Sequence, residues 1–218
     1  MSVLHGFGMG IATQNSAGET LDVFYPNPLS NIGDELASVV SGLSGPLDND
    51  QLAELSKGFS AVGADEQAKL ADQLRASTGR VVATTLIDNT APASVADAYL
   101  KLHLLSHRKV KPHGTELEGL FGLLPNVAWT DQGAVCLSDL PQRQLDARLK
   151  GAVLEVASVD KFPKMTNYVV PSGVRIAHTA RVRLGAYLGE GTTVMHEGFI
   201  NFNGGTEGPG MIEGIPRS

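Results

Sequence analysis

The chain has 218 residues, of which 42% are hydrophobic, and a formal net charge of −6. This length suits one sizeable domain, or a modest domain with a smaller module. The acidic balance, without basic runs interleaved with aromatic residues, argues against a nucleic-acid partner. No apolar run approaches the ~18–20 residues of a membrane span, and the N-terminus lacks the pattern of a secretory signal. These features favour a soluble cytoplasmic protein.

Cysteine usage favours the same compartment. Cys136 is the only cysteine, which excludes an intrachain disulfide and suits a reducing environment. It lies in the apolar run AVCL with no histidine beside it. We therefore expect a small core residue rather than a nucleophile.

The first 90 residues predict a mixture of strands and amphipathic helices. Strands are expected at 6–13, 21–28 and 80–87, and helices at 32–43, 49–59 and 65–76. Pro26 and Pro28 would stop the second strand, because proline cannot donate to a sheet. Asp65 is the expected N-cap of the third helix, and Gly79 its stop. The glycines of GFGMG are spaced by two, which does not match a dinucleotide-binding loop.

Residues 94–114 predict a mostly buried helix. Ser94 is the expected N-cap, and a proline and a glycine near the end would close the segment. His103 and His107 lie four residues apart and would share a face, so one hypothesis is a metal-binding pair. His103 stands among leucines and the segment lacks the HExxH glutamate. A structural or substrate-contact role is the stronger interpretation.

The next segment predicts further strands and then a change of character. Residues 120–137 are expected to form strand, turn and strand, followed by a short helix at 141–149 and a strand at 152–159. Residues 1–159 would then form an N-terminal α/β globular domain. The stretch 160–173 carries two prolines and a glycine and is expected to be a connector.

A six-residue period follows the connector. Aliphatic residues recur at Ile176, Val182, Leu188, Val194 and Ile200. Each hexad is typical of a short strand and a tight turn, and three hexads make one coil of a parallel β-helix with the aliphatic residues inside. Residues 174–218 would supply about two and a half such hexapeptide-repeat coils. Because the pattern is still running at GIPRS, we expect an incomplete solenoid.

The repeat segment presents three kinds of candidate site residue. His178 and His196 would stack on adjacent coils as a metal-binding pair, although a third histidine is missing. Glu197 and Glu213 are carboxylates among glycines and apolar residues, where partial desolvation favours a nucleophile or base. The alternative is that both are solvated turn residues. Three cations would suit a dicarboxylate acceptor or serve as solvated turn charges: Arg175, Arg181 and Arg183.

Four longer motifs carry a family resemblance: AYLKLHLLSHRKVKPHG, LLPNVAWT, VDKFPKMTNYVVPSGVRIA and ARVRLGAYLGEGTTVMHEGFINFNGGTEGPGMIEG. From near residue 1 to Gly214 the chain resembles the tetrahydrodipicolinate N-succinyltransferases, in the branch with a long N-terminal α/β domain. The resemblance implies transfer of succinyl from succinyl-CoA to the amino group of ring-opened tetrahydrodipicolinate, 2-amino-6-oxopimelate, in the diaminopimelate route to lysine. It also implies homotrimers of left-handed parallel β-helices with active sites between adjacent subunits.

The resemblance also assigns site residues. The glutamate of its M-[IV]-E-G motif, the proposed catalytic residue, corresponds to Glu213. The glutamate of MHEGF, associated with a magnesium site on the trimer axis, corresponds to Glu197. Ala180 stands where some members carry an aspartate that contacts the metal, and Arg217 lies two residues past the arginine of the usual E-G-R. The further coils that supply much of the CoA surface in the family do not follow, so an apparently truncated member is expected.

Two alternatives stay open. The first is another hexapeptide-repeat acyltransferase, such as an acetyltransferase acting on sugar nucleotides, which would differ in its acyl donor and acceptor. The second is a non-catalytic truncated subunit that acts only in trimer assembly and co-assembles without turnover. The motifs assign no CoA-binding residue under any of these hypotheses.

Overall fold

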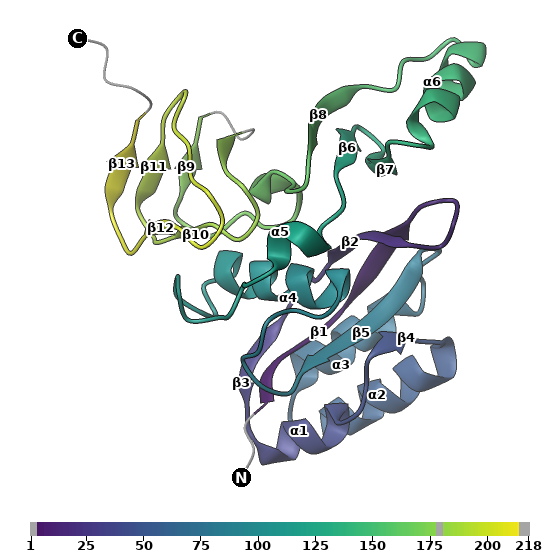
Figure 1. Cartoon of the computed structure of the whole chain (residues 1–218). Coiled ribbons are helices and arrows are strands. Elements are labelled where there is room, and N and C mark those ends of the chain that lie inside the picture. The colour runs from purple at the N-terminus through teal and green to yellow at the C-terminus, as the bar shows by residue number, and fades with distance from the viewer. Residues whose placement is uncertain (1–3, 178–180, 214–218) are drawn as a thin grey trace.

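The computed structural model describes residues 4–177 and 181–213, and it begins with an antiparallel sheet (Figure 1). The strand order is β2-β1-β5-β4, and β3 also pairs with β1. The bounds are Leu4–Gln14 for β1, Thr20–Phe24 for β2, Leu29–Ile32 for β3, Gly45–Pro46 for β4 and Arg80–Leu86 for β5. The three strands predicted for this part of the chain are confirmed, and β3 and β4 are short additions.

Three helices pack against one face of this sheet. They are α1 (Asp34–Val40), α2 (Asn49–Ala61) and α3 (Asp65–Leu74). Their apolar side chains enclose Phe7 and Met9 of β1 in a hydrophobic core of their own. The predicted cap of α3 is wrong. Only residues 62–64 join α2 to α3, so the cap position falls on Ala64, which makes no side-chain hydrogen bond, and the helix ends before Gly79 is reached.

Helix α4 (Val95–Ser106) packs against the other face. Its cap is confirmed: the Ser94 hydroxyl accepts from the Asp97 amide, and the Asp97 carboxylate accepts from the Ser94 amide. The helix is shorter than predicted. Arg108 takes a left-handed φ of 59°, which ends the helical path, and Pro112 has no N–H to continue it.

The glycines spaced by two in β1 have a packing role. A Cβ atom on Gly8 would come 2.6 Å from Tyr25 and 2.9 Å from Leu100 of α4. Alternate residues of a strand share one face. The GFGMG pattern therefore marks the face on which Tyr25 and α4 approach the strand closely.

Residues 127–160 form a projecting arm (Figure 1). It contains β6 (Val127–Thr130), β7 (Gly133–Cys136), α6 (Leu140–Leu149) and β8 (Val156–Asp160), with the strand order β7-β6-β8. The strand predicted to begin at residue 120 is wrong, because Leu120–Leu123 forms the short helix α5 after a left-handed Gly119. A short apolar run such as LFGLL fits either state by periodicity alone.

The C-terminal part consists of parallel strand pairs with a constant offset. Val194 pairs with Ile176 and with Ile212, which lie 18 residues away on either side, and Val182 forms a bridge with Ile200. The strands are β9 (Arg175–Ile176), β10 (Tyr187–Leu188), β11 (Thr192–Val194), β12 (Gly205–Thr206) and β13 (Gly210–Ile212). Three hexads make 18 residues, so the predicted period is confirmed by the pairing. We call residues 175–213 the coils.

Helix α4 joins the coils to the sheet. Its buried leucines share one hydrophobic core with Val23 of β2, Trp129 of β6 and the inward aliphatic residues of the coils. The Ser106 hydroxyl accepts from Gly185 N at 2.8 Å and donates to Ala186 O at 3.1 Å. Within the described ranges, none of the helices has the length and apolar composition needed to cross a bilayer.

Candidate functional site

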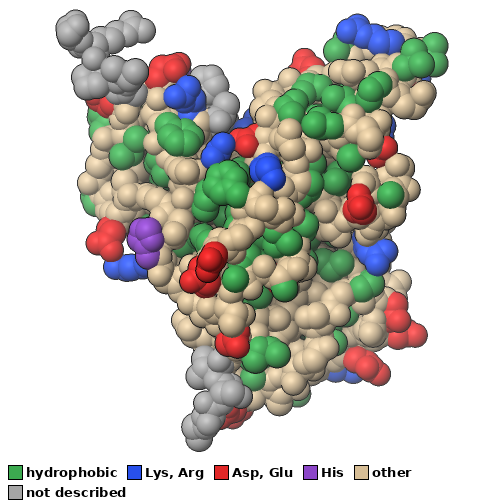
Figure 2. Space-filling model, viewed as in Figure 1, with side chains coloured by type: hydrophobic (Ala, Val, Ile, Leu, Met, Phe, Trp, Pro, Cys, Tyr) green, Lys and Arg blue, Asp and Glu red, His purple; other side chains and the backbone are tan. Residues whose placement is uncertain are grey.

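A groove of about 450 Å³ lies between β8 and the coils, in the hollow visible in Figure 2. Its walls bring together cationic and aromatic side chains from segments far apart in the sequence. The residues that matter here are Asp160, Phe162, Lys164, Arg181, Arg183 and Phe199. This combination suits an anionic ligand with an apolar portion.

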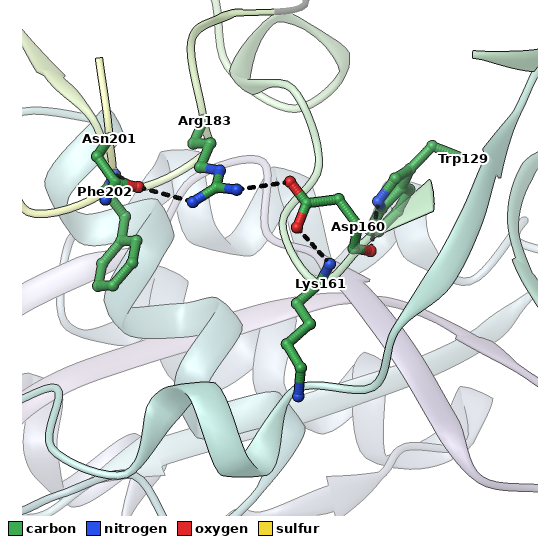
Figure 3. Close-up of polar contacts among 6 residues, drawn as sticks. All are labelled: Trp129, Asp160, Lys161, Arg183, Asn201 and Phe202. Atoms are coloured by element: carbon green, nitrogen blue, oxygen red, sulfur yellow. Dashed lines mark hydrogen bonds and ion pairs between the residues drawn. The ribbon is translucent and has the colours of Figure 1, made fainter. Parts of the chain in front are cut away.

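Arg183 is fixed in this groove by two hydrogen bonds (Figure 3). Its Nη2 donates to Asp160 Oδ2 at 2.8 Å, and its Nη1 donates to Asn201 Oδ1 at 3.0 Å. The guanidinium lies 5.0 Å from the ring centre of Phe162 and 5.8 Å from that of Phe199, within cation–π range. Arg183 therefore ties the arm to the coils and shapes the groove.

Asp160 is the junction between the arm and the coils. Its carbonyl accepts from Trp129 Nε1 at 3.0 Å, and its Oδ1 accepts from Lys161 N at 2.7 Å (Figure 3). Beyond it, Pro163 O accepts from Leu184 N at 3.0 Å. The segment expected as a connector is thus held on both sides. Its DKFPK motif, with charges around an aromatic residue, was the available sequence signal for this part of the site.

Arg181 and Lys164 supply the remaining positive charge of the groove. Arg181 Nη1 lies 3.6 Å from Glu197 Oε2, and both side chains are largely exposed. Arg175 lies in β9 and does not line the groove. The structure therefore brings together two of the three arginines that the sequence analysis grouped.

Glu197 occupies a tight turn with a left-handed φ of 63°. Its carboxylate is exposed and paired with Arg181. Among the described residues, no group of three or more histidine, cysteine, aspartate or glutamate side chains is placed to hold a metal ion. One carboxylate that already faces an arginine does not fit magnesium within a single chain. The metal-contact position Ala180 lies outside the described residues.

Glu213 directly follows β13 and is exposed. It is not a lining residue of the groove that holds Arg181 and Arg183. His196 is also exposed, while its proposed partner His178 and the arginine at position 217 lie outside the described residues. The two candidate carboxylates are therefore both solvent-facing on one chain.

His103 has a structural role. It is fully buried, and its Nε2 accepts from Tyr25 N at 3.2 Å while its Nδ1 lies 2.7 Å from Tyr99 O. These partners fix the neutral tautomer with the proton on Nδ1. Burial lowers the pKa of His103 to about 3. Because both ring nitrogens are occupied, the metal-pair hypothesis for His103 and His107 is wrong, and the structural interpretation is confirmed.

A buried acid near this histidine escaped the sequence analysis. Asp22 accepts a hydrogen bond from the hydroxyl of Tyr168, and burial raises the pKa of its carboxyl group. Its second oxygen and the Tyr99 hydroxyl have no partner among the described residues. No sequence signal distinguished Asp22 from an ordinary strand residue. The contact ties β2 to the turn that precedes the coils.

Cys136 is half-buried at the end of β7 rather than in the core. The Ser138 hydroxyl lies 3.2 Å from its sulfur, and this hydrogen bond lowers the pKa of the thiol. The prediction of a core residue is therefore wrong in position, because the apolar run AVCL ends at the exposed rim of a short hairpin.

Comparisons with known proteins fit this architecture of a mixed α/β domain followed by parallel coils. A solved structure from Campylobacter jejuni, described as a 2,3,4,5-tetrahydropyridine-2-carboxylate N-succinyltransferase, matches with a TM-score of 0.85 and 25% identity. It covers 98% of this chain and 62% of the other. The class is thus an α/β protein with an appended set of 18-residue coils.

Sequence relatives are closer. Relatives named 2,3,4,5-tetrahydropyridine-2,6-dicarboxylate N-succinyltransferase are 57% identical in Pseudomonas putida over 98% of this chain and 48% identical in Vibrio cholerae over 95% of it. Residues 124–164 match the family model described as Tetrahydrodipicolinate N-succinyltransferase middle. The chain belongs to this family. It spans 64% of the Pseudomonas putida relative and 63% of the Vibrio cholerae one.

Proposed function

We propose that this chain takes part in succinyl transfer from succinyl-CoA to the amino group of tetrahydrodipicolinate, as 2-amino-6-oxopimelate, in the diaminopimelate route to lysine. The observation that carries the proposal is the 57% identity that extends over 98% of the chain. The groove adds a chemical reason, because Lys164, Arg181 and the fixed Arg183 suit the carboxylates of such substrates.

Glu213 is the proposed catalytic residue. Its carboxylate would attack the thioester carbonyl of succinyl-CoA, forming a mixed anhydride and expelling the CoA thiolate. The substrate amine would then attack the anhydride, forming the amide, losing a proton and restoring the carboxylate. The exposed position of Glu213 after β13 leaves it accessible to both substrates.

The proposed assembly is a cytoplasmic homotrimer. In it, residues 1–159 form the α/β domain, 160–173 the connector and 174–218 a left-handed parallel β-helix. Magnesium, if part of the enzyme, would be held by Glu197 from three chains rather than by one, since one chain supplies a single carboxylate paired with Arg181. The 18-residue parallel pairing supports the β-helix part of this proposal.

The test is CoA-thiol release by the purified chain with succinyl-CoA and tetrahydrodipicolinate. We expect release that requires both substrates and falls by at least about 100-fold in Glu213→Gln. Glu190→Gln is the matched control, because Glu190 is another exposed carboxylate of the coils. Equal activity of both variants would remove Glu213 from the mechanism. No release from this chain or from a chain with the full length of its relatives would overturn succinyl transfer.

A further inference from the structure

The arm carries two elements that the rest of the chain leaves uncovered. Helix α6 has ten residues and none of them is buried. Isolated helices of this length are marginal in water, so such a helix normally depends on a packed face. Its exposed apolar residues are Leu145 and Leu149, and the Leu149 side chain is 77% exposed.

Strand β8 is equally open. It forms one edge of the β7-β6-β8 sheet, and its residues Val156–Ser158 together with Val159 are exposed. An open edge presents unpaired backbone groups that other strands can bind. A hollow of about 740 Å³ flanks β8 on the α6 side, and the groove described above flanks it on the side of the coils. The uncovered surface is therefore continuous from α6 to the coils.

Charge indicates what covers this surface. The C-terminal half of α6 and the residue after it carry three cations, Arg143, Arg148 and Lys150, against one acid, Asp146. Residues 184–213 carry four glutamates and neither lysine nor arginine. Two of those glutamates are paired within the chain, with Lys111 and Arg181. Glu190 and Glu213 remain exposed acids on the coils.

Apolar surface is complementary as well. The coils expose Phe199 and Met211, while the arm exposes Leu149 and Val159. A basic, apolar arm and an acidic, apolar coil surface on the same molecule match each other between copies. We propose that the arm is an intersubunit clasp, in which α6 and β8 cover the coils of a second copy of this chain. The proposal refines the homotrimer named above and does not depend on succinyl transfer.

The first test is sedimentation of the wild-type chain and of Leu149→Asp and Val159→Asp. We expect wild-type oligomers and at least a 10-fold rise in the dissociation constant for both variants. Ile87→Asp is the matched control, because Ile87 is 72% exposed and lies outside the arm. All three positions are exposed, so the urea midpoint of the monomer should stay unchanged. A monomeric wild type, which leaves the arm to another protein, or unaffected arm variants would overturn the proposal.

The second test locates the contact. Chains labelled with nitrogen-14 and nitrogen-15 are mixed, allowed to exchange subunits and treated with a carbodiimide, which joins a lysine to a carboxylate in direct contact. We expect mixed-isotope cross-links from Lys150 to Glu190 or Glu213. Cross-links of Lys150 found only within one isotope would overturn the proposal. Turnover is measured on the same samples, so failure of the clasp and failure of the proposed reaction remain distinguishable.

Discussion

Helices α4 and α6 have similar lengths, 12 and 10 residues, and opposite surroundings. Every residue from Ala98 to Ser106 of α4 is buried, whereas α6 buries none. The difference follows from composition: AYLKLHLL is apolar on nearly all sides, while LPQRQLDARL alternates leucines with polar and charged residues. Helix α4 is thus stabilised by the core it joins, and α6 by local propensity and by whatever covers the arm.

Truncation of one leucine in each helix should show the largest contrast. Leu102→Ala should lower the free energy of unfolding by about 2–5 kcal/mol, because Leu102 is fully buried between the sheet and the coils. Leu149→Ala should change it by less than about 0.5 kcal/mol in the dissociated chain, since an exposed side chain leaves no cavity. Urea unfolding at low protein concentration measures both. Equal losses would show that α6 is packed within its own chain.

Features that depend on local pattern were predictable from the sequence. The period of six is enforced because each inward residue, such as Leu188 or Val194, must fill the interior of the coils. The cap at Ser94 follows from its hydroxyl and the acid three residues later. By contrast, α5 replaced a predicted strand because a five-residue apolar run carries no period of its own.

Contacts between distant segments were not predictable. Asp160 and Arg183 are 23 residues apart and meet only because the chain returns along the coils after the arm. The two nitrogens of His103 are occupied by backbone groups of Tyr25 and Tyr99, and Tyr25 comes from another strand. Sequence spacing placed His103 on a helix face but did not identify those partners, so the metal hypothesis stayed open until the fold was known.

Two glycines with left-handed backbones sharpen the comparison between the helices. Gly185 (φ 93°) lies under α4, and a Cβ atom there would come 2.5 Å from Leu102; Gly151 (φ 73°) follows α6 with nothing within 4 Å. Gly185→Ala should cost about 2–4 kcal/mol, the sum of backbone strain and overpacking. Gly151→Ala should cost only the strain, about 1 kcal/mol. Similar unfolding midpoints for the two variants would contradict close packing of α4 on the coils.

Acid should act on α4 through His103. Its pKa is about 3 in the fold and 6.5 ordinarily, so below pH 6.5 the unfolded chain binds a proton that the folded chain does not. Stability is therefore lost as the pH falls, by about 2 kcal/mol between pH 8 and pH 5. His5 and His107 have lowered pKa values too and act in the same direction.

The contribution of His103 is isolated by comparing slopes. In His103→Gln, the dependence of the urea midpoint on pH should be weaker than in the wild type, whatever the starting stability of the variant. Helix α6 contains no histidine, so its local hydrogen exchange offers an internal reference for general acid effects. Identical slopes for wild type and variant would show that His103 is not held neutral by its two backbone partners.

The smallest expected effect concerns how each helix begins. Ser94 caps α4 through a reciprocal pair of hydrogen bonds with Asp97, whereas the residue before α6 makes no side-chain cap. Ser94→Ala should lower the free energy of unfolding by about 1 kcal/mol, and Ser94→Asp, which keeps an acceptor, should recover most of it. Hydrogen exchange at the first turn of α4 locates the change. Because α4 is anchored by its core, the loss should stay within that turn; spreading into the coils would mean that the cap, and not the buried leucines, holds α4 in place.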